Sequence, residues 1–317
     1  MSTTRLAMQR SQDLLKQSGH AVADVWTDVR SFDLDWILPY RTAFSARLIT
    51  SPTTWMSLLF GFVPLVGGFF IGDENQLLAW LVMYSGAAWT VYFYLVVAKR
   101  ASSLVLGLAA GVFTILIGYP LLLMTRPIPP LSWMYDAITP QESVGRFIGY
   151  VLAVGPHEEL VKALPVLVLA FGLRRVSKPM DGLFYGALSG VALAGREAQQ
   201  YIAQMNNINA VLYQALLRST TLPFLHATWT GIAGYFIGLA VVSRTRRAGL
   251  CVLGIAIAAV LHGVFDFASE RVASVAIAAF VYLLFTSYID RSNEMVRGLA
   301  GVNMPDSAPC AVEPAAG

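Results

Sequence analysis

Residues 147–171 read FIGYVLAVGPHEELVKALPVLVLAF, an apolar run with three ionisable side chains at its centre. These are the adjacent carboxylates of Glu158 and Glu159 and the ammonium of Lys162. On membrane-insertion scales each charge at the middle of a helix costs roughly 2.5–3.5 kcal/mol, so chance rarely leaves three together. The stretch therefore predicts a membrane helix whose charged face lies at a functional site; a purely structural buried ion pair is the simpler alternative.

The composition is that of a protein embedded in a lipid bilayer. Of the 317 residues, 56% are hydrophobic and only 13% are charged, whereas soluble domains carry about 25% charged residues. The net charge of +3 is too small to indicate binding to nucleic acid. We therefore predict a multi-pass membrane protein without a nucleic-acid partner.

Apolar segments of membrane-spanning length recur along the chain. Eight can be counted, near residues 53–72, 77–98, 102–124, 144–172, 181–201, 219–242, 248–268 and 272–289. Each is close to the roughly 20 residues that cross the hydrocarbon core, where the backbone must satisfy its own hydrogen bonds. Glycines spaced four apart, at 182, 186 and 190 and at 234 and 238, predict close helix packing. The predicted fold class is all-α: a polytopic transmembrane helical bundle of about eight spans.

Basic residues are concentrated in every second connection between the predicted spans. Lys99 and Arg100 follow the second span, Arg174 and Arg175 follow the fourth, and Arg246 follows the sixth. The alternate connections, at 73–76, 125–143 and 202–218, carry at most one cation each. Because cytoplasmic loops are enriched in Lys and Arg, this pattern predicts that both termini are cytoplasmic. We expect the inner (plasma) membrane.

Four consecutive predicted spans each carry a pair of polar residues spaced i, i+4, which places both on one helix face. The pairs are Glu158/Lys162, Glu197/Tyr201, His226/Thr230 and His262/Asp266. Under the predicted topology, their carboxylates and imidazoles fall in the middle-to-outer part of the membrane at 1.5 Å per helical residue. We therefore expect these groups to converge on one cavity, with a helix kink at Gly155-Pro156 beside it.

Such a cavity suits the activation of water. A carboxylate held there can act as a general base, and the two histidines could donate to a developing oxyanion or bind a metal together with a glutamate. Asp266 could orient an imidazole or serve as a further ligand. Structural roles remain open for His226, for Glu197 and for Tyr201, which could be an interfacial aromatic residue.

The ordered motifs resemble the PrsW family of intramembrane proteases. The motifs are Glu-Glu-x-x-Lys at 158–162, Glu-x-x-x-Tyr at 197–201, His-x-x-x-Thr at 226–230 and His-x-x-x-Asp at 262–266. The resemblance covers roughly residues 147–270 and extends to a wider group that includes the prenyl-protein (CAAX) endopeptidases and bacteriocin-immunity-type membrane proteases. Arg196 and Ala198 depart from the family's pattern around Glu197.

The resemblance implies hydrolysis of peptide bonds within the membrane. The implied substrate is a membrane-anchored protein, for example a regulatory one like an anti-sigma factor. It implies that Glu158 or Glu159 activates the water, and we prefer Glu159. Glu197, His226 and His262 would bind the oxyanion or a metal, and Asp266 would support His262. A divalent metal such as zinc, held by His226, His262 and Glu158, and a metal-free glutamate mechanism both remain open. Lys162, Tyr201 and Thr230 would have supporting roles.

Four regions follow from these patterns. Residues 1–50 are expected to form cytoplasmic or interfacial amphipathic helices, and residues 51–143 a three-span region. Residues 144–290 form the predicted catalytic membrane core, and residues 291–317 a flexible tail.

Two other functions fit the same residues. Intramembrane Glu, His and Lys also serve proton relays, so a proton-coupled transporter is an alternative. Transporters are commonly built from inverted repeats, whereas here the polar residues crowd into spans 4–7. A catalytically inactive relative that binds membrane proteins is the third interpretation.

Overall fold

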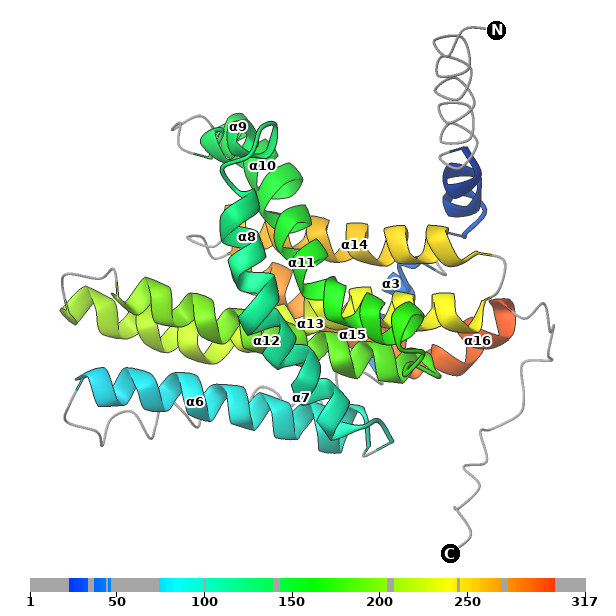
Figure 1. The fold of residues 1–317 in the computed structure, drawn as a ribbon, viewed down its shortest axis with the longest axis horizontal. Helices are drawn as coiled ribbons and strands as arrows, with labels where there is room; N and C mark the ends of the chain where they lie inside the picture. Colours follow the sequence, from blue (N-terminus) through cyan, green and yellow to red (C-terminus); the bar gives the residue numbers. More distant parts are fainter. Residues whose placement is uncertain are drawn as a thin grey trace, which may run out of the picture.

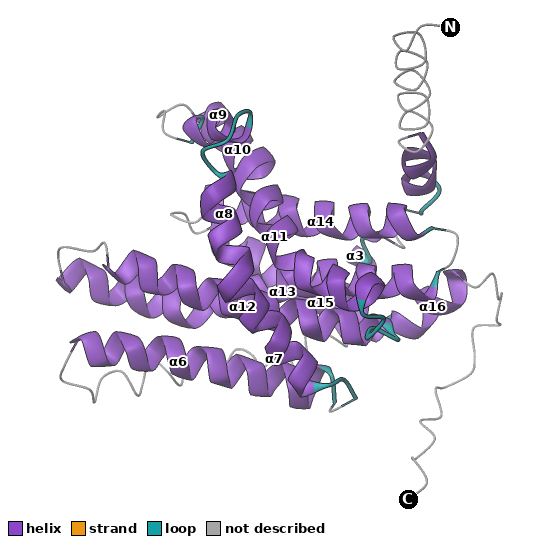
Figure 2. Ribbon diagram, in the orientation of Figure 1, coloured by secondary structure: helices purple, strands orange, loops and turns teal. Residues whose placement is uncertain are grey.

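The computed structural model describes residues 23–33, 37–43, 45–46, 74–99, 101–138, 143–203, 208–243, 246–268 and 273–299. Throughout these ranges the regular structure is helical and no strand occurs, which confirms the all-α prediction (Figure 2). The predicted span at 53–72 and the end of the predicted tail lie outside the described residues.

Residues 23–30 are helical, and the further elements follow in chain order. The helices are α3 (Tyr40–Ala43), α6 (Glu74–Tyr92), α7 (Leu104–Phe113), α8 (Tyr119–Thr125), α9 (Leu131–Asp136), α10 (Ser143–Gly149), α11 (Gly155–Leu167), α12 (Pro179–Ala203), α13 (Ile208–Val242), α14 (Arg247–Ala268), α15 (Ala273–Asp290) and α16 (Ser292–Leu299). Four π-helical turns continue them: η1 (Phe93–Val97), η2 (Thr114–Gly118), η3 (Tyr150–Val154) and η4 (Val168–Gly172).

The long helices form a bundle in which two runs cross the others. Helices α6, α12, α13 and α14 extend along the long axis of the molecule, while the α7–α8 run and the α10–α11 run cross them obliquely (Figure 1). The pairs α12–α13 and α13–α14 have the largest helix interfaces, and α11 packs on α14. The four helices that carry the polar pairs, α11 to α14, are thus neighbours.

The α12–α13 contact depends on glycines. A Cβ atom added at Gly182 would lie 2.1 Å from the carbonyl oxygen of Gly234, and one at Gly190 would lie 2.3 Å from that of His226. Both distances are shorter than any real contact of a Cβ atom, so the two backbones touch. This contact fixes the position of His226 along the axis of α12.

A second glycine contact seats α11 against α14. A Cβ atom at Gly155 would lie 2.1 Å from the carbonyl oxygen of Ala259, and one at Gly263 would lie 2.4 Å from that of Tyr150. The helix leading to Gly155 widens into the π-helical turn η3. The break or kink expected at Gly155-Pro156 is therefore a π-helical turn within one continuous helical run.

By length and composition, four helices within the described ranges can cross a membrane: Leu104–Thr125, Thr221–Val242, Arg247–Ala268 and Ala273–Asp290. A shorter apolar helix covers Val82–Val97. These coincide with five of the predicted spans. The total of eight spans and the cytoplasmic location of both termini stay predictions.

Two segments that the sequence analysis treats as a connection and a tail contain helix. Helix α13 begins at Ile208, so most of the expected 202–218 connection is helical, because apolarity marks where a helix crosses lipid and not where it ends. The expected flexible tail begins with α16, whose Met295 is fully buried and accepts a 3.5 Å contact from the Tyr235 hydroxyl. Packing against α13 thus orders this segment.

We predict that Gly234→Ala lowers the thermal unfolding midpoint of the purified protein in detergent by several degrees. The new Cβ would lie 2.1 Å from the Gly182 carbonyl oxygen, and overpacking of this kind typically costs about 1–3 kcal/mol. The matched control is Gly86→Ala on α6, whose Cβ would meet nothing nearer than 3.8 Å. Equal midpoints for the two variants would contradict the α12–α13 backbone contact.

Candidate active site

The ammonium of Lys162, a side chain with no exposed surface, lies at the centre of the polar cluster. Its Nζ lies 2.5 Å from Glu159 Oε1 and 3.6 Å from Glu158 Oε2. The same atom lies 3.2 Å from Nδ1 of His226 and 3.5 Å from Nδ1 of His262. Helices α11, α13 and α14 therefore meet around one buried cation.

Glu159 has both carboxylate oxygens engaged. Oε1 lies 2.9 Å from His262 Nδ1 in addition to the Lys162 contact, and Oε2 accepts a 2.9 Å hydrogen bond from the Thr230 hydroxyl. The side chain has no exposed surface. This geometry disfavours the role of water-activating base that we expected for Glu159, because neither oxygen faces an open space.

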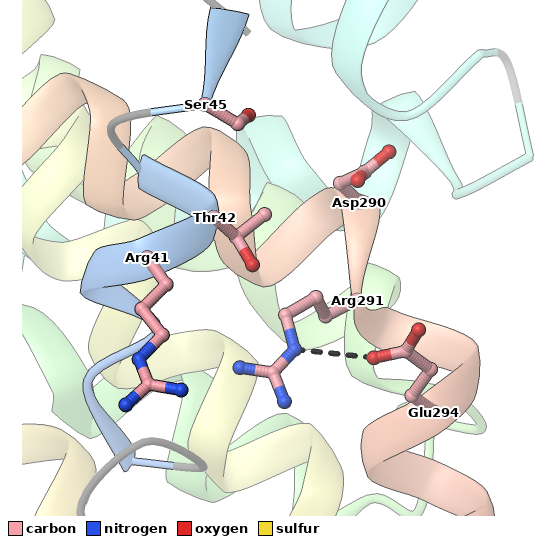
Figure 3. A pocket seen from close by; sticks show the side chains of 6 residues that line it. All are labelled: Arg41, Thr42, Ser45, Asp290, Arg291 and Glu294. Carbon is pink, nitrogen blue, oxygen red and sulfur yellow. Dashed lines mark hydrogen bonds and ion pairs between the residues drawn. The ribbon is translucent and has the colours of Figure 1, made fainter. Parts of the chain in front are cut away.

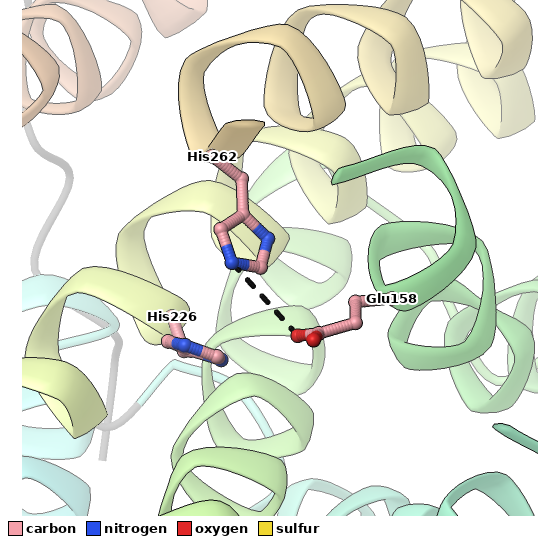
Figure 4. Close-up of side chains that lie close together, drawn as sticks. All are labelled: Glu158, His226 and His262. Atoms are coloured by element: carbon pink, nitrogen blue, oxygen red, sulfur yellow. Dashed lines mark ion pairs between the residues drawn. The ribbon is translucent and has the colours of Figure 1, made fainter. Parts of the chain in front are cut away.

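Glu158 is arranged differently. Its side chain is 13% exposed, and its buried Oε2 has no hydrogen-bond partner among the described residues. That oxygen faces His262 Nε2 at 3.8 Å (Figure 4). Glu158, His226 and His262 each offer one ligand atom, and these atoms all lie within 4.8 Å of one another.

Two further carboxylates border the imidazoles. Oε2 of Glu197, on α12, lies 3.5 Å from His226 Nε2, and Oδ2 of Asp266 lies 3.4 Å from His262 Nε2. Both side chains are about a quarter exposed, at 24% for Glu197 and 23% for Asp266. Oε2 of Glu197 has no hydrogen-bond partner within the described part of the chain. The cluster therefore has a closed side at Lys162 and an open side at these carboxylates.

Of the remaining predicted residues, Thr230 contacts Glu159, as described above. Tyr201 belongs to the last turn of α12, but its side chain lies outside the described residues.

Trp229 belongs to the cluster, although no sequence motif indicated it. Its ring stacks on His262 at 4.3 Å between centroids with an interplanar angle of 13°, and lies 5.3 Å from the ring of His226. The side chain is fully buried. The one available signal was its position three residues after His226, and an aromatic residue in an apolar helix does not stand out.

The residues present fit a divalent metal. Two histidines and one carboxylate are a common donor set for catalytic zinc, with a fourth position left for water. His262 contacts Glu159 through Nδ1, the kind of outer contact that orients a metal-binding imidazole through its other nitrogen. Nδ1 of His226 lies 3.2 Å from Lys162 Nζ. When Nε2 of a neutral imidazole binds a metal, Nδ1 carries the proton and cannot accept from an ammonium. Metal binding by His226 therefore requires Lys162 to lose this contact and to keep its carboxylate partners.

A pocket of about 380 Å³ lies elsewhere, at the C-terminal end of α15, and is lined by Arg41, Thr42, Ser45, Asp290, Arg291 and Glu294 (Figure 3). Arg291 Nε lies 3.1 Å from Glu294 Oε2. The two arginines are balanced by two carboxylates, so the lining has no net charge that would favour an anion.

The fold and the cluster together define a class: a helical membrane protein with an intramembrane centre of glutamate, histidine and lysine. A family model described as PrsW family intramembrane metalloprotease matches residues 99–289, more than half of the chain. The chain belongs to the PrsW family.

Protease PrsW of Shouchella clausii (strain KSM-K16) is 25% identical to this chain over 147 residues. The match covers 46% of this chain and 64% of the relative, so it spans less than two thirds of the relative's length. No solved structure matches.

We predict that Lys162→Met destabilises the protein by about 3–5 kcal/mol, because it leaves the Glu159 carboxylate buried without its cation. The double variant Lys162→Met/Glu159→Gln should recover most of that loss. Lys178→Met is the control: Lys178 is 41% exposed, and its buried partner Asp181, at 3.9 Å, keeps hydrogen bonds from Ser102 and Ser177, so the variant should lose only about 0–1 kcal/mol. Denaturation in detergent measures the free energy of unfolding of the three variants. A double variant as unstable as Lys162→Met would contradict the pairing of Lys162 with Glu159.

Proposed function

We propose that this protein is an intramembrane endopeptidase that hydrolyses peptide bonds of membrane-anchored proteins. The observation that carries the proposal is the partly exposed Glu158 carboxylate, which lies with the imidazoles of His226 and His262 inside a bundle of apolar helices, with one ligand atom of each residue within 4.8 Å of the others. Membership in the PrsW family and the likeness to Protease PrsW of Shouchella clausii support it. A regulatory membrane protein, such as an anti-sigma factor, is the kind of substrate we propose.

Glu158, His226 and His262 would hold a divalent metal such as zinc. When bound, such an ion polarises the scissile carbonyl and lowers the pKa of a water molecule to near neutrality. The chain's part is to hold these three donors within 4.8 Å of one another and to leave one side of the centre open. Glu159 and Trp229 contribute by orienting the ring of His262, through Nδ1 and through its face respectively.

Glu197 is the best placed general base. Its Oε2 lies 3.5 Å from His226 Nε2, has no hydrogen-bond partner in the described part of the chain, and belongs to a side chain that is 24% exposed. A base must lie within hydrogen-bond reach of the attacking water, directly or through one other water. Glu197 would take a proton from that water and return it to the leaving amine. Asp266, whose Oδ2 lies 3.4 Å from the metal-binding Nε2 of His262, would serve as a further ligand.

The topology that we propose has eight spans with both termini in the cytoplasm of a cell whose inner (plasma) membrane holds the protein. The alternation of basic and non-basic connections supports it. In that arrangement the centre lies in the outer half of the membrane, where a cut would release the external part of an anchored protein.

Replacing Glu158 and Glu197 by glutamine, one at a time, should separate their roles. We predict that Glu158→Gln loses both bound metal and peptide cleavage, whereas Glu197→Gln keeps its metal and loses about 10²–10⁴-fold in kcat, the usual contribution of a general base. The assays are metal analysis of purified protein and cleavage in liposomes. Glu294→Gln on α16, 70% exposed, should match the wild type. Full activity of Glu158→Gln would refute the proposed centre.

Removal of the metal should abolish cleavage. We expect 1,10-phenanthroline to inactivate the wild-type protein and stoichiometric zinc to restore it, because the three donors leave a position for water. Cleavage that persists in metal-free protein would contradict the metal-binding part of the proposal and would leave Glu158 and Glu197 as metal-free catalysts.

A further inference from the structure

Two helix ends, remote in sequence, carry cations in an unusual backbone conformation. Lys99 follows the π-helical turn η1 after one intervening residue, and Arg174 follows η4 in the same way. Their φ angles are 48° and 53°, and they are the two non-glycine residues with positive φ within the described ranges. Glycine is the usual residue at such a helix end, because a Cβ atom disfavours left-handed backbone. The chain thus keeps cationic side chains at two positions where glycine would be less strained, and strain of this kind is a reason to look for a function.

A buried carboxylate joins the two connections to which these cations belong. Oδ1 of Asp181 accepts a 2.7 Å hydrogen bond from the Ser102 hydroxyl, and Oδ2 accepts from the backbone N–H and the hydroxyl of Ser177, at 3.0 and 2.8 Å. Lys178 Nζ donates to the carbonyl oxygen of Ala101 at 2.7 Å. Asp181 is only 4% exposed. The two connections are therefore held side by side by buried contacts.

The cations on the outside of these connections are not compensated. Lys99, Arg174 and Arg175 are all exposed, and their side chains have no hydrogen-bond or ion-pair partner in the described part of the chain. The carboxylate of Asp181 is directed inward and both its oxygens already accept hydrogen bonds. We call Lys99, Arg174 and Arg175 together the basic surface; its charge attracts an anion from outside the chain.

The basic surface lies where the apolar part of the bundle ends. The connection 98–103 separates the apolar helix Val82–Val97 from the candidate membrane span Leu104–Thr125. Exposed apolar side chains adjoin the cations on both connections, with Val105 74% and Leu173 60% exposed. A free anion or an acidic soluble protein would leave these apolar side chains uncovered. An amphiphile with a negative headgroup matches both the charge and the apolar neighbours.

We propose that the basic surface binds the headgroup of an anionic phospholipid, whose acyl chains lie along the neighbouring apolar side chains. The guanidinium groups of Arg174 and Arg175 suit the paired oxygens of a phosphodiester, and Lys99 adds a third positive charge. The basic surface shares no residue with the centre at Glu158, so lipid binding does not depend on the proposed protease function.

The test compares two lipids that differ in net charge. Purified full-length protein in neutral detergent is equilibrated with phosphatidylglycerol or with phosphatidylcholine of the same acyl chains, and native mass spectrometry counts the bound lipids. The wild type should bind phosphatidylglycerol more tightly. Lys99→Asn, Arg174→Asn and Arg175→Gln should each lower that affinity about fivefold, the usual effect of one cation near a membrane surface, and leave the affinity for phosphatidylcholine unchanged.

The choice of asparagine separates charge from backbone strain. Asparagine tolerates positive φ, so Lys99→Asn and Arg174→Asn should unfold at the wild-type midpoint in detergent without lipid. A cation can also stabilise the carbonyl end of a helix. A lowered midpoint together with unchanged lipid binding would assign the cations to the helix ends and overturn the proposal. Arg175→Gln has ordinary backbone geometry and tests the charge independently of the two strained positions.

Arg297→Gln is the matched control, since Arg297 is an exposed cation in the last turn of α16. It should bind phosphatidylglycerol as the wild type does, and an equal loss there would replace the proposed site with a diffuse surface charge. Equal affinity of the wild type for the two lipids would also overturn the proposal. Displacement of the lipid by millimolar inorganic phosphate would contradict the part of the proposal that commits to a lipid.

Discussion

The structure depends on the buried ammonium of Lys162. A charge without exposed surface is tolerated in a protein interior only when other groups pair with it, and here Glu159 lies at 2.5 Å while both imidazoles lie within 3.5 Å. Glu159 in turn contacts His262 on α14 and Thr230 on α13, so the pairing of this one cation also fixes how α11, α13 and α14 face one another. The same requirement commits both oxygens of Glu159, whereas Glu158 lies farther from the ammonium, at 3.6 Å, and Glu197 contacts His226 instead.

Backbone contacts make this arrangement geometrically accessible. Gly190 allows α12 to touch α13 at His226, and Gly155 allows α11 to touch α14 at Ala259, one turn before His262. With no side chains between the backbones at these heights, the polar side chains reach one another across the bundle. The closed side of the cluster thus provides stability, and the side with the partly exposed carboxylates of Glu158 and Glu197 provides the chemistry that we propose.

Much of this could be predicted from the sequence, because a charge in an apolar run and the i, i+4 spacing are both visible there. The roles of Glu158 and Glu159 could not be separated, since they depend on the rotation of α11 about its axis, which the π-helical turn Tyr150–Val154 changes. Trp229 is an ordinary residue of an apolar helix by sequence.

The most direct test of the central claim is mass spectrometry of products formed in H₂¹⁸O by the purified protein in liposomes with a single-span membrane peptide. The account predicts a cut within the apolar span or at its outer edge, with one ¹⁸O atom in the new carboxylate and no product from Glu158→Gln. A product formed equally by Glu158→Gln, or a cut confined to segments remote from the membrane, would contradict it.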